Sequence, residues 1–215
     1  MQPYETKLSH LFGERQSQRN ALGNALISLG EEFPELFVLS PDVGPSTKAI
    51  RFRDRFPERY VCSGIAEMNT VGLAAGLAYL GYKPLIAGYA MFVAGKAWEP
   101  FRNSIAYPNL NVKLVGTHAG INVGPDGVTH QAIEDIALMR SIPNVHVYVP
   151  ADANQVLPAL RRALNIEGPV YIRLEREPLR TLQINQEPGD FHDFYEILPG
   201  DDMKLFAIGG MVEPC

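Results

Sequence analysis

Side chains that can hold and move protons stand close together in one glycine-rich stretch of the sequence. His118 is followed by Asp126 and His130, and four glycines lie among them between positions 116 and 127. Imidazoles and carboxylates transfer protons near neutral pH, and glycines let a backbone bend around a ligand. The three side chains are also plausible metal ligands, although no HxH or HExxH spacing and no third His or Cys supports a metal site. A glycine-rich turn with incidental histidines is the remaining interpretation.

A single carboxylate, Glu67, begins an otherwise apolar segment of helical spacing that follows a strand end. The helix dipole stabilises a negative charge there, so an ordinary capping acid explains Glu67 as well as a functional one does. The aromatic residues Tyr89 and Phe92 follow the apolar run at positions 84–87. Core packing is the default interpretation of such a pair, and a flat heteroaromatic ligand would be held by the same residue types.

Basic and hydroxyl side chains form a third set of candidates: Arg19, Ser46, Arg173 and Arg176. The planar guanidinium group of arginine suits a phosphate or a carboxylate. Each arginine alone is explained equally well as a solvated surface charge. A binding site therefore requires that these residues converge in the fold.

Apolar runs of strand length alternate with longer segments of helical spacing. We predict buried strands at 36–39, 84–87, 112–115, 145–149 and 170–172. We predict helices at 18–29, 66–80, 92–106, 131–141 and 151–165, with Ser17 capping the first, Gly30 ending it and Pro158 kinking the last. The alternation indicates an α/β fold in three layers, with a doubly wound, mostly parallel sheet and helices on both faces. Sites in such a fold lie at the carboxyl ends of the strands.

The composition of the 215-residue chain excludes several classes of protein. Hydrophobic residues make up 46%, enough for a sizeable core, and a net charge of -5 without a basic run argues against a nucleic-acid partner. No run of about 18 apolar residues is present, so we expect no membrane span. The polar residues 1–20 contain no apolar signal region, and two cysteines are too few for a disulfide framework. A cytoplasmic location is the default that follows.

The pattern changes after about Arg176. We predict one domain over residues 1–180, and a linker with the start of a truncated carboxy-terminal domain over residues 181–215. The polar segment 177–193 reads as the linker, and the apolar run 204–208, followed by Gly209 and Gly210, as one more strand. A strand with so little sequence after it cannot build a domain, so we expect a truncated chain or a domain supplied elsewhere.

Four motifs follow one another along the chain: GIAE at 64–67, AMF at 90–92, GPDGVTHQ at 124–131 and LMRSIPN at 138–144. In this order and spacing they resemble the pyrimidine-binding domain of transketolases. The resemblance extends from about Ser17 to Arg176 and is closest to the separate carboxy-terminal subunit of split transketolases. Deoxyxylulose phosphate synthases and the beta subunit of pyruvate dehydrogenase share the fold, but less of the detail.

The resemblance implies a set of residues for the cofactor, thiamine diphosphate. Glu67 matches the glutamate that hydrogen-bonds the pyrimidine ring and so activates the cofactor. Tyr89 and Phe92 match aromatic residues that pack around that ring, and Asp42 matches an aspartate near the thiazolium ring. Gly95 stands where many transketolases have a further tyrosine, so the packing around the ring is expected to differ there.

The resemblance also implies residues for the substrate. Asp126 matches a residue that contacts a substrate hydroxyl, and His130 one that contacts the reacting oxygens of the donor. The positions that hold the sugar phosphate correspond to Arg19, Ser46, His118 and Arg176. Arg173 aligns with an arginine of the deoxyxylulose phosphate synthases and is a weaker candidate. Val128 replaces a usual proline, which is a minor change.

The implied reaction transfers a two-carbon ketol unit from a ketose phosphate to an aldose phosphate, as in the pentose phosphate pathway. The family holds the diphosphate and its Mg²⁺ or Ca²⁺ through a GDG motif and a following asparagine in another domain. This sequence has no such pattern. We therefore expect half of a site, inactive alone, that needs a diphosphate-binding amino-terminal subunit in a homodimer or heterotetramer.

Other functions stay open on the sequence alone. A subunit of another thiamine diphosphate enzyme, synthase-like or 2-oxo acid dehydrogenase beta-like, would use the same residue types. A non-catalytic partner-binding domain would have the same fold without a working partner. A nucleotide-binding module is weakened by the absence of a phosphate-binding loop.

Overall fold

The structure is a computed structural model that describes residues 9–183 and 195–215. Most of the segment predicted as a linker lies outside these ranges, so the domain boundary near residue 180 stays a prediction. Within the described ranges, no helix is both long enough and apolar enough to cross a membrane.

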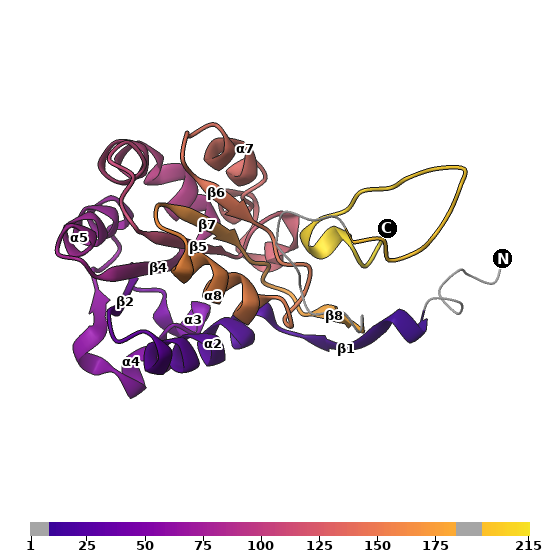
Figure 1. Cartoon of the computed structure of the whole chain (residues 1–215), viewed down its shortest axis with the longest axis horizontal. Helices are drawn as coiled ribbons and strands as arrows, with labels where there is room; N and C mark the ends of the chain where they lie inside the picture. The colour runs from indigo at the N-terminus through magenta and orange to yellow at the C-terminus, as the bar shows by residue number, and fades with distance from the viewer. Residues whose placement is uncertain (1–8, 184–194) are drawn as a thin grey trace.

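Six parallel strands form the central sheet in the order β3-β2-β4-β5-β7-β6 (Figure 1). They are β2 (Leu36–Ser40), β3 (Tyr60–Cys62), β4 (Lys83–Tyr89), β5 (Lys113–Thr117), β6 (His146–Tyr148) and β7 (Val170–Arg173). The central strand β5 is buried along its whole length. Near-continuous apolar runs are typical of such strands, because helices cover both faces of a parallel sheet.

Helices bury two separate groups of apolar side chains against the two faces of the sheet. One group joins the sheet to α2 (Gln18–Glu32), α4 (Ile50–Arg55) and α8 (Val156–Asn165). The other joins it to α5 (Glu67–Tyr79), α7 (Asp135–Arg140) and the helical segment at positions 91–106. Val38 and Leu39 of β2 belong to opposite groups, since successive side chains of a strand point to opposite faces. Figure 1 shows α2 and α4 below the strands and α7 above them. The predicted fold class is confirmed.

Short helical turns complete the described chain. They are α3 (Gly44–Thr47) and the 3₁₀ turns η1 (Ser9–Leu11), η2 (Pro57–Arg59), η5 (Ile121–Asp126), η6 (Val128–His130) and η7 (Gly209–Met211). The turns η5 and η6 lie in the glycine-rich stretch that follows β5.

The first long helix, α2, begins where the sequence predicts but ends later. Ser17 is its N-cap, because the Ser17 side chain accepts a hydrogen bond from the Asn20 backbone N–H at 3.3 Å. The prediction that Gly30 ends the helix is wrong, since α2 continues past it. The rings of Phe52 and Phe56 approach Gly30 so closely that any side chain there would collide with them. This glycine therefore serves close packing.

The other predicted helices differ in bounds or geometry. α8 begins at Val156, so Pro158 lies in its first turn, where a missing N–H leaves no helical bond unmade, and the predicted kink is wrong. The predicted helix at 131–141 shortens to α7, which begins only at Asp135. The segment 92–106 is helical, but α6 (Trp98–Pro100) separates the π-helical stretches η3 (Met91–Lys96) and η4 (Phe101–Ala106). Pro100, which cannot donate a helical bond, falls at this junction.

Two strands lie outside the main sheet. β1 (Phe12–Gln16) pairs antiparallel with β8 (Leu179–Leu182) and forms a two-stranded ribbon that extends from the sheet (Figure 1). β8 falls in the segment predicted as a linker. The sequence analysis predicts neither β8 nor β3: Arg180 and Thr181 interrupt the apolar residues of β8, and β3 is a run of only Tyr60, Val61 and Cys62 between polar neighbours.

The strand predicted at 204–208 does not form. These residues have no regular structure, and Leu205, Phe206 and Ile208 are exposed. A strand must pair its backbone groups with a neighbouring strand, and no strand of the described residues pairs with this segment. The prediction from apolar residues alone is therefore wrong.

Candidate active site

The residues predicted to carry chemistry gather at one edge of the sheet. Asp42 follows β2, Tyr89 ends β4, His118 follows β5, and Arg176 comes shortly after β7. These four strands are consecutive neighbours in the sheet, so their carboxyl ends bring together residues that are far apart in sequence. Ligands of doubly wound folds bind at this edge.

Four of the predicted residues form one hydrogen-bonded cluster, which we call the His118 group: Arg19, Ser46, Tyr89 and His118. The Tyr89 hydroxyl donates to Ser46 Oγ at 2.8 Å, and Ser46 Oγ lies 3.3 Å from His118 Nε2. The Arg19 guanidinium, from α2, lies 3.1 Å from the Ser46 carbonyl oxygen and 3.4 Å from His118 Nε2. The ring centroids of Tyr89 and His118 are only 4.0 Å apart.

The partners of His118 fix which ring nitrogen carries the proton. Thr117 Oγ1 donates to the Gly88 carbonyl oxygen at 3.1 Å, so it accepts from His118 Nδ1 at 2.8 Å. The Arg19 guanidinium can only donate, so Nε2 is left as an acceptor. Burial, followed by the charge of Arg19, lowers the pKa of His118 from 6.5 to about 4. At neutral pH, His118 is therefore an uncharged imidazole whose Nε2 lone pair faces the cluster.

A second arginine approaches Arg19 beside the His118 group. Burial is the largest cause that lowers the pKa of Arg19, and the charge of Arg176 adds to it. Arg19 Nε is buried and has no hydrogen-bond partner in the described chain. Arg176 Nη1 is paired with the exposed Glu177 at 2.8 Å. Two close cations and an unused buried donor favour an anionic ligand, which would supply the missing partner.

The loop that follows β5 brings His130 and Asp126 toward the same edge. Tyr89 and Phe92 stack with centroids 6.4 Å apart, and the His130 ring lies edge-on to Phe92 at 5.1 Å and 6.1 Å from Tyr89. Asp126 is near enough to His118 to oppose the lowering of its pKa. The His130 imidazole and the Asp126 carboxylate thus lie beside the Tyr89–Phe92 pair and beside the two arginines Arg19 and Arg176, which we call the cationic cluster.

Two predicted residues have other neighbours. Glu67, the first residue of α5, is 5% exposed, and its Oε2 accepts from Lys96 Nζ at 2.8 Å. Asp42 follows β2 with a left-handed φ of 61°, and Cys62 Sγ donates to its Oδ1 at 3.7 Å. In the described chain, neither carboxylate shares a hydrogen bond with the His118 group. Glu67 and Asp42 therefore lie outside the His118 group.

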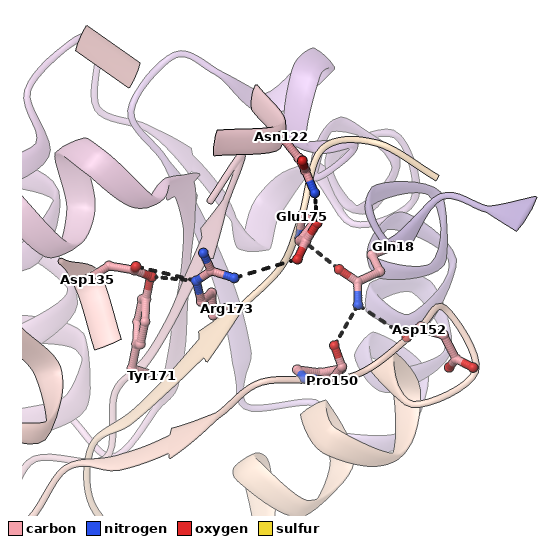
Figure 2. Close-up of polar contacts among 8 residues, drawn as sticks. All are labelled: Gln18, Asn122, Asp135, Pro150, Asp152, Tyr171, Arg173 and Glu175. Carbon is pink, nitrogen blue, oxygen red and sulfur yellow. Dashed lines mark hydrogen bonds and ion pairs between the residues drawn. The ribbon is translucent and has the colours of Figure 1, made fainter. Parts of the chain in front are cut away.

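Several residues of the site are not evident from the sequence. Lys96 is one, although its spacing of four from Phe92 on a helical segment is a signal that could have located it. The others surround Arg173: Asp135 and Glu175 form ion pairs with it, and the Asn122 side chain donates a hydrogen bond to Glu175 (Figure 2). They come from separate segments, and no spacing along the chain connects them. Arg173 is thus engaged by carboxylates, apart from the His118 group.

In the described ranges, no three His, Cys, Asp or Glu side chains are arranged to hold a metal ion. His118, Asp126 and His130 come close to one another around the aromatic pair without forming such a set.

A family model described as "Transketolase, pyrimidine binding domain" matches residues 14–181. Among known sequences, the putative transketolase C-terminal section of Methanocaldococcus jannaschii is 41% identical over 201 residues, which cover 93% of this chain and 64% of that protein. The 6-deoxy-6-sulfo-D-fructose transketolase subunit SqwH of Clostridium sp. (strain MSTE9) is 33% identical over 98% of this chain and 64% of its own length. The 1-deoxy-D-xylulose-5-phosphate synthase of Thermus thermophilus is 40% identical over 88% of this chain and 31% of its own length.

Solved structures are similar to this fold over most of the chain. A protein described as "Split gene transketolase, inactive beta4 tetramer" superposes with a TM-score of 0.69 and 46% identity, over 85% of this chain and 57% of that one. The transketolase of Campylobacter jejuni subsp. jejuni superposes with a TM-score of 0.73 and 25% identity, over 88% and 32%. The chain therefore spans less than two thirds of each of these relatives.

Proposed function

Because this chain belongs to the family of transketolase pyrimidine-binding domains, we propose that it is the pyrimidine-binding half of a thiamine diphosphate-dependent transketolase. Its reaction moves a two-carbon ketol unit from a ketose phosphate to an aldose phosphate. The observation that carries this proposal is the convergence of Arg19, Ser46 and His118 with a second arginine, Arg176, beside a stacked aromatic pair.

The cationic cluster suits the phosphate of a sugar. Arg19 brings a buried donor without a partner, and the Arg176 charge lies close to it. A phosphate would neutralise both arginines and accept from Arg19 Nε, which offsets the cost of burying that donor. The names of two relatives, a sulfofructose transketolase subunit and an apulose-4-phosphate transketolase subunit, also describe sugars with an anionic group.

The aromatic pair and the buried carboxylate fit the pyrimidine of the cofactor. Tyr89 and Phe92 present stacked rings of the kind that hold a flat heteroaromatic group. Glu67 is a buried carboxylate at a helix start and would hydrogen-bond the pyrimidine ring, with Asp42 near the thiazolium ring. Lys96 is half exposed and can return to water, whereas Glu67 is buried, so a ligand that displaces Lys96 must itself supply a hydrogen-bond partner for that carboxylate. Thiamine diphosphate, when bound, supplies the reactive carbon that breaks and forms the carbon–carbon bond.

The residues of this chain would then orient the sugar and handle its protons. His130, next to the aromatic pair, would exchange a proton with the reacting oxygen of the donor, and Asp126 would hold a neighbouring hydroxyl. His118 is neutral, so its Nε2 accepts a hydrogen bond and adds no charge to the site. Positioning of this kind is the protein's share of the chemistry.

A partner must supply the other half of the site, which includes the diphosphate-binding groups and Mg²⁺ or Ca²⁺. Apolar side chains that a partner would cover are exposed around Glu67: Ile65, just before α5, and Met68 and Leu73 within it. The far end of α5 exposes two more, Tyr79 and Leu80. A diphosphate-binding transketolase subunit, in a heterotetramer, is the partner that this half-site requires, and the chain alone is expected to be inactive.

Reconstitution tests the proposal. The chain is mixed with a diphosphate-binding transketolase subunit, thiamine diphosphate and Mg²⁺, and ketose phosphates or pyruvate are offered as donors beside an aldose phosphate as acceptor. We expect ketose use without release of carbon dioxide, and only when both proteins are present. Pyruvate-dependent release of carbon dioxide would instead assign the chain to a synthase, a reading favoured by its 40% identity to the Thermus thermophilus enzyme. No cofactor-dependent activity with any donor would leave a non-catalytic domain as the answer.

A further inference from the structure

Both ends of the loop that carries Asp126 and His130 are tied to the end of β7. We define the site loop as residues 120–135. Near its start, Asn122 Nδ2 donates to Glu175 Oε2 at 2.8 Å. At its end, Asp135 accepts from Arg173 Nε at 3.1 Å and 3.3 Å (Figure 2). Arg173 and Glu175 point to the same side of β7 because they are two residues apart on an extended chain.

Arg173 and Glu175, which hold the two ends of the site loop, are paired with each other and are buried. Arg173 Nη1 and Glu175 Oε1 form an ion pair at 3.8 Å, with only 13% and 10% of the side chains exposed. Asp135 is 2% exposed and also accepts from the buried Tyr171 hydroxyl at 2.7 Å. Arg173 lies so close to Gly120 that a side chain there would meet its guanidinium. Every charge in this network therefore has a fixed partner inside the protein, which is the condition for a buried network to be rigid.

Glu175 also holds the helix that carries Arg19. The backbone N–H of Glu175 donates to Gln18 Oε1 at 2.7 Å, and Gln18 Nε2 donates to the Pro150 carbonyl oxygen at 2.9 Å. Gln18 is fully buried and precedes Arg19, while Glu175 precedes Arg176. One carboxylate residue thus connects the site loop to both arginines of the cationic cluster.

From this arrangement we infer that Glu175 and Arg173 are positioning residues, which set Asp126 and His130 of the site loop at a fixed place relative to Arg19 and Arg176. Neither residue needs to touch the substrate. Arg173, whose charge Asp135 and Glu175 already neutralise, is accordingly assigned to this scaffold and not to phosphate binding. The inference rests on the proposed function for its catalytic consequence, whereas its structural content stands on the contacts alone.

The structural content is tested on the chain by itself. Asn122→Ala removes only the anchor at the start of the loop, and Asn122 is exposed, so the fold should persist. The backbone N–H groups of Gly127 and His130 are hydrogen-bonded within the loop. We expect their hydrogen exchange, followed by NMR, to accelerate about 10-fold, with β4 and β5 unchanged. Asn165→Ala, which removes an exposed asparagine of α8, is the control. Unchanged exchange in the loop would overturn the inference.

The catalytic content is tested in the mixture with the diphosphate-binding subunit. Asn122→Ala should lower kcat for a ketose phosphate about 10-fold while the KM for thiamine diphosphate stays unchanged, because only the sugar-facing loop moves. Glu175→Gln keeps an acceptor for Asn122 but loses the charge that faces Arg173. Its kcat is therefore expected to lie between that of the parent chain and that of Asn122→Ala. Faster loop exchange together with wild-type kcat would contradict the positioning role. If the wild-type mixture proves inactive, the proposed function fails, and the exchange result alone still decides whether the loop is anchored.

Discussion

The imidazole of His118 is held between a hydroxyl and a guanidinium, and both neighbours constrain its charge. Thr117 Oγ1 accepts from Nδ1, and the Arg19 guanidinium donates to Nε2. A second proton would put a charge on a buried ring, and on Nε2 that charge would also face the guanidinium. The pKa of His118 therefore falls from 6.5 to about 4, and the residue contributes an acceptor to the site at neutral pH.

This pKa shift predicts a pH dependence of stability. Between pH 6.5 and about pH 4, the unfolded chain binds a proton at His118 and the folded chain does not. The unfolded state is thus favoured as the pH falls, and the free energy of unfolding should decrease through that window. His118→Gln has no such proton to bind, so its stability should fall less between pH 7 and pH 5. Urea melts of both proteins at these two pH values measure the difference, and parallel curves would contradict the assigned shift.

Arg176 makes a separate prediction about substrate charge. Arg176→Ala should raise the KM for a phosphorylated donor about 10- to 100-fold, the effect of losing a charge-assisted hydrogen bond. The KM for an unphosphorylated ketose should hardly change. Arg55→Ala, which removes an exposed arginine paired with Glu31, is the control. Equal effects on both donors would show that Arg176 does not bind the phosphate.

At the scale of elements, glycines allow strands and rings to approach each other behind the site. A side chain on Gly116 of β5 would lie 2.5 Å from the Tyr171 hydroxyl, which is bonded to Asp135. Gly72 of α5 has open space around it. The same substitution should therefore have opposite effects at these two positions.

Gly116→Ala should lower the free energy of unfolding by about 1–3 kcal/mol, because it overpacks a core that cannot yield. Gly72→Ala should raise it by up to about 1 kcal/mol, because alanine is the better helix former. Denaturant melts of the two variants beside the parent chain measure both effects. A stabilised Gly116→Ala chain would mean that Tyr171 moves freely, against the rigid network described here.

Much of the sheet could be predicted, because apolar runs flanked by helical spacing leave few alternatives to a parallel strand. The strands near the ends of the chain were harder to predict. In the described residues β8 pairs with β1 alone, at the other end of the domain, and local spacing gives no sign of that pairing. The apolar run at 204–208 fails for the opposite reason, since it is strand-like in composition but pairs with no strand of the described residues.

The residues of the site divide in the same way. Arg19, Ser46, His118 and Tyr89 were predicted from the resemblance to a family, and the fold brings them into one cluster. The residues that tie the site loop to the end of β7 were not predicted. Asn122, Asp135 and Glu175 come from separate segments of the chain, and only the fold brings them together. Lys96 was missed although it pairs with Glu67: its spacing of four from Phe92 indicates its own position, but nothing in the sequence connects it to Glu67.

At the scale of the whole molecule, the chain presents one edge of a site and an apolar helix beside it. The described residues offer an aromatic pair, a cationic cluster and a buried carboxylate, and the motif that holds a diphosphate is not in the sequence. Under the proposed function, activity is expected only from an assembly with a diphosphate-binding subunit. The exposed residues of α5 next to Glu67 place that carboxylate at the border where a partner would complete the site.

The central claim is that Glu67 activates thiamine diphosphate held between this chain and its partner. Its most direct test is the turnover of the reconstituted enzyme with Glu67→Gln, beside Glu31→Gln as a control at an exposed glutamate of α2. We expect kcat to fall at least about 100-fold in Glu67→Gln, while the two proteins still assemble and the control stays at the parent rate. Near-parent turnover by Glu67→Gln would contradict the account.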